Sequence, residues 1–206
     1  HLDRGPVVLF VSRLHPRNRL DLLFEAMVVL ADEYPDLRTV VIGDGTDEKQ
    51  RLLALVKELG LGDKVRFEDA IFDEDELAPW FMSADVLVYP AMVGLTAIHA
   101  FGYGVPVVAN SSPTANGPEW AAIRHGENGL LFSDGESGEL ADALRTIFAD
   151  AALRERMSNE AMRTVQRQYS LEAMVRGFEE AIRHGASQTR EPTPRPEPGS
   201  SEGDGD

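Results

Sequence analysis

The chain has 206 residues, 20 of them Lys or Arg and 35 Asp or Glu, which gives a formal net charge of −15 at pH 7. It has no cysteine, so disulfides, thiolate metal sites and a cysteine nucleophile are excluded. No apolar run is long enough to insert into a membrane and no signal peptide is visible. The acidic balance argues against a dedicated nucleic-acid binder, and we expect a soluble cytoplasmic protein.

Short apolar runs alternate with segments in which apolar residues recur at helical spacing. In chain order the pattern predicts a strand at 6–11, a helix at 20–34, a strand at 37–43, a helix at 47–59, a strand at 65–67, a helix at 74–83, a strand at 85–89, a helix at 94–103, strands at 105–109 and 130–132, and helices at 136–149, 152–168 and 171–183. This alternation is typical of an α/β protein with a Rossmann-like parallel sheet and helices on both of its faces.

The end of the chain has a different composition. Residues 186–206 hold four of the twelve prolines, many Gly, Ser and acidic residues, and no large apolar side chain. Such a segment cannot bury enough surface to offset the entropy lost on ordering. We therefore expect one domain over residues 1–185 and a disordered acidic tail over residues 186–206.

The loop after the first predicted strand is rich in arginine. Arg13, Arg17 and Arg19 lie between that strand and the next helix, and a guanidinium group matches phosphate oxygens with two parallel hydrogen bonds. The three side chains either converge on a phosphate or pyrophosphate or are solvated loop residues. We interpret His15, in the same loop, as a loop residue rather than a base or a ligand.

The loop after the second predicted strand contains the sequence Gly43-Asp44-Gly45. Glycines at this place permit a tight turn and a close backbone approach. The motif is neither a Walker phosphate loop nor a dinucleotide fingerprint. We interpret Asp44, Asp47 and Glu48 as structural residues, because acidic side chains are favoured at the N-terminus of the helix that follows.

The loop after the fourth predicted strand leads into the helix at 94–103. The backbone amides of Gly94, Leu95 and Thr96 predict an anion site at the start of this helix, and the Thr96 hydroxyl adds a donor. His99 follows three residues later on the same helix face. A long polar segment at 111–129 contains Glu119, and we expect it to close over the same edge of the sheet.

Taken in order, these motifs resemble those of a known family. The donor half of the GT-B glycosyltransferases, and in particular the retaining family-4 group, is similar in the strings VSRLHPRNRLDLLFEA, VVIGDGTDEKQRLLALVKELGLGDKVRF, ADVLVYP, GLTAIHAFGYGVPVVAN, PEW and ENGLLF. The likeness extends from residue 6 to about residue 180. It implies that the chain corresponds to the C-terminal half of a GT-B enzyme, the half that binds a nucleoside diphosphate sugar.

The resemblance implies roles for several residues around the donor diphosphate. Arg13 matches an arginine that holds the diphosphate in that family. A lysine five residues later falls on Asn18, so one cationic contact is missing, and Arg17 or Arg19 is the candidate replacement. The amides of Gly94, Leu95 and Thr96 complete the expected diphosphate contacts.

The sugar and base contacts implied by the resemblance depart from the family pattern. The family has two glutamates on either side of a Gly-Leu pair, one facing the sugar and one the ribose. Here those positions are Ala91 and His99, so both carboxylates are absent, and His99 is expected to bond the ribose through a ring nitrogen. Glu119 is a further candidate for the ribose and sugar region. The base is expected beside three loop residues, Asp69, Ala70 and Ile71.

The activity implied is transfer of a hexose, with retention, from a nucleoside diphosphate sugar to an acceptor hydroxyl. The expected partners are the nucleotide sugar and either a separate N-terminal acceptor half or a second copy of the chain, since the acceptor domain is not in this chain. No catalytic residue, cofactor or metal site is assigned.

Two alternatives are weighed against this activity. The missing carboxylates, the Asn18 replacement and the absent half also fit a non-catalytic nucleotide-sugar-binding or regulatory module. A flavodoxin-like receiver domain is disfavoured, because it would gather acidic residues where this chain has Arg13.

Overall fold

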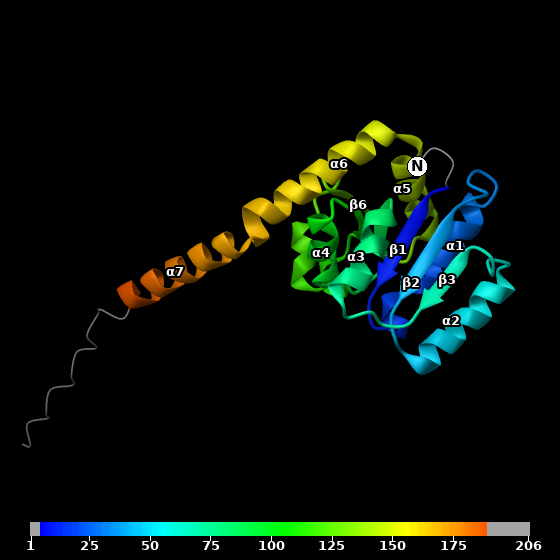
Figure 1. Cartoon of the computed structure of the whole chain (residues 1–206), viewed down its shortest axis with the longest axis horizontal. Coiled ribbons are helices and arrows are strands. Elements are labelled where there is room, and N and C mark those ends of the chain that lie inside the picture. The colour runs from blue at the N-terminus through cyan, green and yellow to red at the C-terminus, as the bar shows by residue number, and fades with distance from the viewer. Residues whose placement is uncertain (1–4, 189–206) are drawn as a thin grey trace, which may run out of the picture. The chain divides into compact units, whose positions relative to one another are not determined.

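The computed structural model describes residues 5–188. Its centre is a six-stranded sheet with the strand order β3-β2-β1-β4-β5-β6, and every neighbouring pair is parallel (Figure 1). The strands are β1 (Val7–Val11), β2 (Arg38–Ile42), β3 (Val65–Glu68), β4 (Val86–Tyr89), β5 (Val107–Asn110) and β6 (Gly129–Phe132). The predicted strands and the predicted parallel sheet are confirmed.

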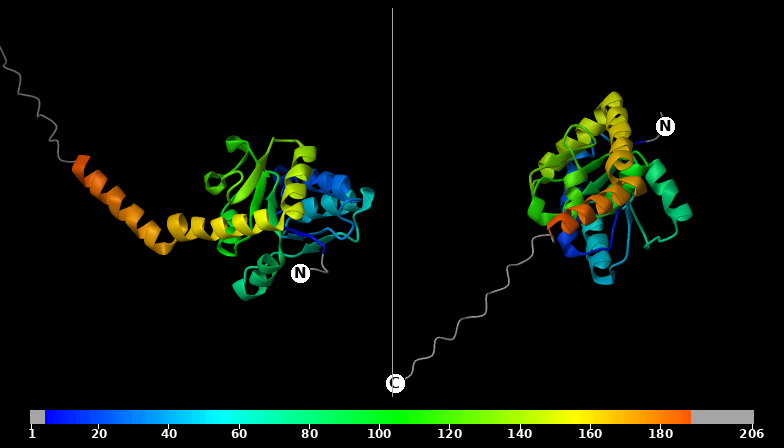
Figure 2. Two further views of the ribbon diagram at one scale, coloured as in Figure 1. Left: turned by 90° about the horizontal axis from the view of Figure 1, so that it is seen from above. Right: turned by 90° about the vertical axis from the view of Figure 1, so that its left-hand side faces the viewer.

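All seven predicted helices form. They are α1 (Leu20–Leu30), α2 (Thr46–Glu58), α3 (Glu74–Ser83), α4 (Thr96–Gly102), α5 (Ser137–Ala149), α6 (Ala151–Thr164) and α7 (Leu171–Gln188). α1 packs against α2 and α5, whereas α3 and α4 pack together on the other face of the sheet (Figures 1 and 2). Helices on both faces of the sheet were predicted and are confirmed.

Several helix ends differ from the prediction. α6 ends at Thr164 rather than residue 168 and is followed by a π-helical turn, Val165–Tyr169, and two other ends differ for evident local reasons. α1 ends at Leu30 rather than residue 34, because Pro35 disfavours the helical conformation in the residue before it. α4 begins at Thr96, so Gly94 and Leu95 precede the helix instead of forming its first turn. The loop amides at 94 and 95 are therefore positioned by the β4–α4 connection.

The inner strands form the core. Val8, Leu9 and Phe10 of β1 and Leu87 of β4 have almost no exposed surface, as expected for strands with helices on both sides. The rings of Phe10 and Tyr89 lie 5.2 Å apart between their centroids and join β1 to β4. The carboxyl ends of these two strands are therefore rigidly fixed relative to each other.

The described chain divides into two units after Tyr169. The first contains the sheet and the helices up to α6, and the second contains α7. α7 runs to Gln188, so residues 186–188 are helical, although we expected them in the disordered tail. The helix can continue through them because Ala186, Ser187 and Gln188 include neither Gly nor Pro. The rest of the predicted tail, residues 189–206, lies outside the described residues.

Candidate functional site

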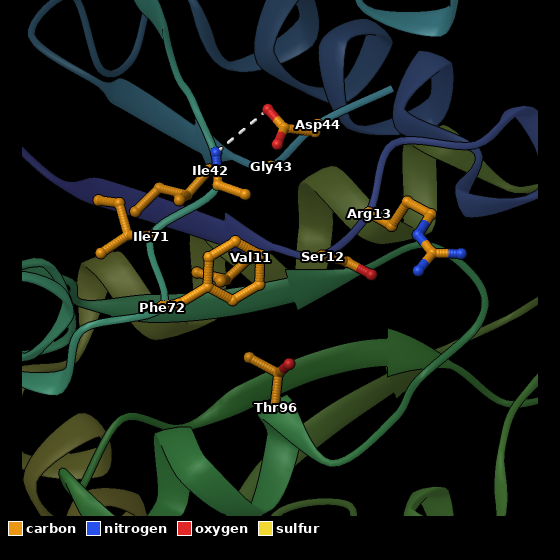
Figure 3. A pocket seen from close by; sticks show the side chains of 10 residues that line it. Val11, Ser12, Arg13, Ile42, Gly43, Asp44, Ile71, Phe72 and Thr96 are labelled. Atoms are coloured by element: carbon orange, nitrogen blue, oxygen red, sulfur yellow. Dashed lines mark hydrogen bonds between the residues drawn. The ribbon is translucent and has the colours of Figure 1, made fainter. Parts of the chain in front are cut away.

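The main candidate site is a pocket of about 420 Å³ at the carboxyl ends of the strands. It lies where the strand order reverses between β1 and its neighbours β2 and β4, the place where ligands bind in open α/β sheets. Its size is in the range of small-molecule sites. Its walls come from four separate loops (Figure 3), and the lining residues are Val11, Ser12, Arg13, Ile42, Gly43, Asp44, Ala70, Ile71, Phe72 and Thr96.

The two glycines of the Gly-Asp-Gly turn shape this pocket. A Cβ atom on Gly43 would lie 1.9 Å from the Ser12 carbonyl oxygen, and one on Gly45 would lie 2.3 Å from that of Leu14. The Leu14 N–H also donates to the Asp44 carbonyl at 2.7 Å. The predicted close approach of backbones is confirmed, and it holds the loops after β1 and β2 together at the edge of the pocket.

The loop after β3 is tied to the loop after β2 by two polar contacts. The Asp44 carboxylate accepts a hydrogen bond from the Ala70 N–H at 3.3 Å, and Lys49 pairs with Asp69 at 2.6 Å. The hydrogen bond and the charge of Lys49 hold the pKa of Asp69 below its ordinary value. The structural role predicted for Asp44 is thus confirmed in an unpredicted form: its carboxylate anchors a second loop.

Of the three residues predicted around the base, Ala70 and Ile71 line the pocket and Asp69 does not. Asp69 is exposed and paired with Lys49 instead. The next residue, Phe72, lines the pocket and was missed by the sequence reasoning, although an aromatic side chain in a loop at the carboxyl end of a strand was a usable signal. Its side chain is 93% exposed.

A second cavity of about 360 Å³ adjoins the first and shares Ser12 and Arg13 with it. Its remaining lining residues are His15, Arg17, Asn18 and Met92. Among residues 5–188, the side chains of Arg13 and Arg17 have no hydrogen bond or ion pair. The structure therefore places two exposed, unpaired guanidinium groups at adjoining cavities, and their predicted contact with phosphate stays a prediction.

Arg19 does not join this pair. Its Nε lies 3.2 Å from an Asp21 carboxylate oxygen, and it lines neither cavity. It holds a left-handed conformation with φ of 56° between a short 3-10 turn, Pro16–Asn18, and α1. Of the two candidate replacements for the missing lysine, the geometry supports Arg17.

Asn18 fixes the shape of the arginine loop. Its side chain is 4% exposed, and its Oδ1 accepts from the His15 N–H at 2.7 Å. The Asn18 N–H in turn donates to the His15 carbonyl at 2.9 Å. His15 Nδ1 accepts from the Arg17 N–H at 3.1 Å, so His15 caps the short turn of this loop; that it is not a ligand stays a prediction, since it lines the second cavity.

The residues at the start of α4 are only partly brought together. Thr96 lines the main pocket, whereas Gly94 and Leu95 line neither cavity. Ala91 is buried, and the residue after it, Met92, closes the second cavity with a left-handed φ of 63°. The sugar contact predicted at Ala91 can come only from its backbone and stays a prediction.

His99 lines neither cavity. Its Nε2 lies 2.9 Å from a Glu74 carboxylate oxygen, and its ring centroid lies 4.6 Å from that of Phe81. Tyr103 also donates to Glu74, and the hydrogen bonds from Tyr103 and His99 lower the pKa of that carboxyl. The structure thus engages His99 between α3 and α4, and its predicted ribose contact stays a prediction.

Glu119 lies in the polar segment as predicted, on a 3-10 turn at Pro118–Ala122. It is half-buried, its carboxylate lies beside Gly117, and no other described residue bonds to it. The Gly117 N–H donates to the Val93 carbonyl at 2.8 Å, which brings the segment against the β4–α4 connection. The contact of Glu119 with the ribose or sugar stays a prediction.

A buried tyrosine supports the floor of the main pocket. The Tyr89 hydroxyl donates to the Val11 carbonyl, and it also interacts with the Ser12 and Thr96 side chains. Burial raises the pKa of Tyr89 to about 12, so the hydroxyl stays protonated and donating at neutral pH. The Tyr89 side chain therefore contacts three residues that line the main pocket, Val11, Ser12 and Thr96.

Two searches of the described part of the chain gave negative results. Residues 5–188 contain no group of three or more His, Asp or Glu side chains placed to hold a metal ion. Over the same range, no helix combines the length and apolar character needed to cross a membrane.

Comparison with known proteins identifies the family. The profile of the family described as "Glycosyl transferases group 1" matches residues 5–150, so the chain belongs to this family. It is 34% identical over 171 residues to D-inositol 3-phosphate glycosyltransferase of Streptomyces coelicolor, covering 78% of this chain and 36% of that protein. It is 31% identical over 177 residues to a lipopolysaccharide core biosynthesis glycosyltransferase of Rhizobium meliloti, covering 84% of this chain and 48% of that protein.

Solved structures show which half of the fold is present. Sucrose-phosphate synthase from Thermosynechococcus elongatus matches with a TM-score of 0.76 and 28% identity, over 89% of this chain and 46% of that one. The C-terminal domain of a glycosyl transferase group 1 protein from Francisella tularensis matches with a TM-score of 0.71 and 28% identity, over 82% and 88%. The fold is thus that of the C-terminal half of a GT-B glycosyltransferase, and the chain spans about a third to a half of its curated relatives.

Proposed function

We propose that the chain is the donor-binding half of a hexosyltransferase that uses a nucleoside diphosphate sugar. The observation that carries the proposal is the position of Arg13, an unpaired guanidinium shared by two adjoining cavities at the carboxyl ends of the strands. The nucleoside would occupy the main pocket. The diphosphate would lie against Arg13 and Arg17, in line with the nucleotide-sugar donors that the family uses.

The proposed reaction breaks the bond between the sugar anomeric carbon and a diphosphate oxygen. A new bond forms to an acceptor hydroxyl, which loses its proton, with retention of configuration at the sugar. Negative charge develops on the leaving diphosphate, and preorganised cationic groups stabilise such charge more strongly in the transition state than in the ground state. In this chain Arg13 and Arg17 would perform that role, and no residue is assigned as acid or base.

The acceptor site and the groups around it are proposed to lie in the other half of the fold. This chain matches 36% of one curated relative and 48% of another, which leaves the acceptor half of those proteins outside the match. α7 offers one surface for that half, since its exposed apolar residues recur at helical spacing. They are Leu171, Met174, Val175, Phe178 and Ile182.

A second candidate function is a nucleotide-sugar-binding or regulatory module without turnover. The observation that favours it is the absence of a carboxylate at Ala91 and His99, with His99 held by Glu74. Both functions require donor binding. They are separated by assaying sugar transfer from the nucleotide sugar with the complete two-half protein, where turnover supports the transferase and binding without turnover supports the module.

Calorimetric titration of the full chain with UDP, GDP and ADP tests the proposal. Arg13→Ala removes a charged hydrogen-bond partner, a loss of about 1.5–3 kcal/mol, so we expect about 10- to 140-fold weaker binding of the preferred nucleotide. Arg38→Ala is the matched control, because Arg38 is an exposed arginine at the opposite end of β2. Equal affinity in Arg13→Ala and the unmodified chain, or no nucleotide binding by the folded chain, would contradict the proposal.

A further inference from the structure

Phe72 is the only exposed aromatic side chain within residues 5–168. A phenyl ring left in water forgoes the free energy that its burial would provide. The other Phe, Tyr and Trp rings within residues 5–168 are buried or half-buried, and the next exposed one, Tyr169, is 38% exposed. Phe72 nevertheless lies on a pocket wall, where a ligand would cover it (Figure 3).

The loop that carries Phe72 is held in place on the side away from the ring. The Ala70 N–H is bonded to Asp44, and Asp69 is paired with Lys49 on α2. On its other side, Asp73 caps the start of α3, with its side chain accepting from the Asp75 N–H. The backbone on either side of Phe72 is therefore held in place before any ligand arrives, which reduces the entropy lost on binding.

The pocket has an apolar part and a polar part. Ile71 and Phe72 lie away from Arg13 in Figure 3, while Ser12 and Thr96 bring hydroxyl groups to the pocket. In the apolar part the only charged lining side chain is Asp44, and one of its oxygens is already bonded to Ala70. A fitting ligand has a flat, weakly polar end and an anionic end.

We propose that the exposed ring of Phe72 is the stacking surface for the nucleobase of the donor, an inference that rests on the proposed function. Every nucleobase has a π-face that stacks on an aromatic ring, and this contact needs no particular hydrogen-bonding edge. Phe72 thereby positions the nucleoside so that its diphosphate reaches Arg13. In this site the ring binds and orients the ligand and takes no part in bond breaking.

The test compares two ligands on the full chain, UDP and inorganic pyrophosphate. Loss of one base-stacking contact weakens binding by about 5- to 140-fold, so Phe72→Ala is expected to weaken UDP by that factor. Pyrophosphate has no base, and its affinity should stay the same. Phe72→Trp should restore UDP binding, because indole also stacks.

Met82→Ala is the matched control, since Met82 is exposed on α3 and lines neither cavity. Thermal unfolding of Phe72→Ala should match the unmodified chain, because the ring has no packing to lose. UDP binding that depends on Arg13 but is unchanged in Phe72→Ala overturns this inference and leaves the proposed function standing. If GDP or ADP is the nucleotide that binds, the same comparison is made with it, and absence of binding of UDP, GDP and ADP to the unmodified, folded chain overturns the proposed function itself.

Discussion

Replacing Asn18 by alanine should destabilise the protein through the arginine loop. The change removes the Oδ1 atom that accepts from the His15 N–H at 2.7 Å, at a position only 4% exposed. Loss of a capping side chain costs about 0.5–2 kcal/mol, and a buried donor left without a partner adds to this. We take a loss of ~1–2 kcal/mol, which corresponds to a fall in Tm of roughly 2–8 °C for a chain of this size.

The assay is thermal unfolding followed by circular dichroism, with Arg17→Ala as the contrasting variant. Arg17 is exposed and its side chain has no partner among the described residues, so its removal should change the free energy of unfolding by less than about 0.5 kcal/mol. We therefore expect the two variants to differ in what they change. Asn18→Ala should lower Tm, and Arg17→Ala should lower nucleotide affinity and leave Tm unchanged.

Asn18→Lys, which restores the residue of the related family, extends this test. It removes the same cap and places an ammonium group at a buried position, so it should be at least as destabilising as Asn18→Ala. An Asn18→Ala protein that unfolds at the temperature of the unmodified chain would refute the reasoning that this side chain shapes the loop.

Two further predictions concern the pocket floor. Gly43→Ala puts a Cβ 1.9 Å from the Ser12 carbonyl oxygen and should lower the free energy of unfolding, measured by urea titration, by more than about 1 kcal/mol. Gly62 has open space around it, so Gly62→Ala should leave the free energy of unfolding nearly unchanged. Equal urea midpoints for the two variants would contradict the argument that the backbones approach closely at Gly43. Because burial raises the pKa of Tyr89 to about 12 from 10.0, its contribution is complete below pH 10 and is lost as pH rises toward 12, up to ~3 kcal/mol. Tyr89→Phe should flatten this alkaline loss of stability, and an unchanged slope between about pH 9 and pH 12 would count against it.

The sheet and its helices could be predicted because their signals are local. Continuous apolar runs such as residues 7–11 and 107–109 are typical of strands covered on both sides, and helical spacing marks the helices between them. The glycine turn was also predictable, since the sequence places Gly43 directly after a buried strand. Helix ends were less so: α4 starts two residues later than its apolar pattern suggests.

The partners of the site residues could not be predicted, because they depend on contacts between distant segments. His99 and Glu74 are separated by 25 positions, and their pairing follows from how α3 packs on α4. Asp69, in the loop after β3, pairs with Lys49 on α2 and does not line the main pocket. The base loop implied by sequence likeness stays a prediction; within it Ala70, Ile71 and Phe72 line the main pocket and Asp69 does not.

Mapping of UDP binding by backbone amide NMR shifts tests the central claim most directly. If the donor nucleotide binds at the carboxyl ends of the strands, the largest shifts should fall on Ser12, Gly43, Ala70, Phe72 and Thr96, and in Arg13→Ala they should need about 10- to 140-fold more UDP. Amides around Ser158 on α6, in another part of the same unit, should not move. Shifts that cluster away from the main pocket, or that persist unchanged without Arg13, would contradict the account.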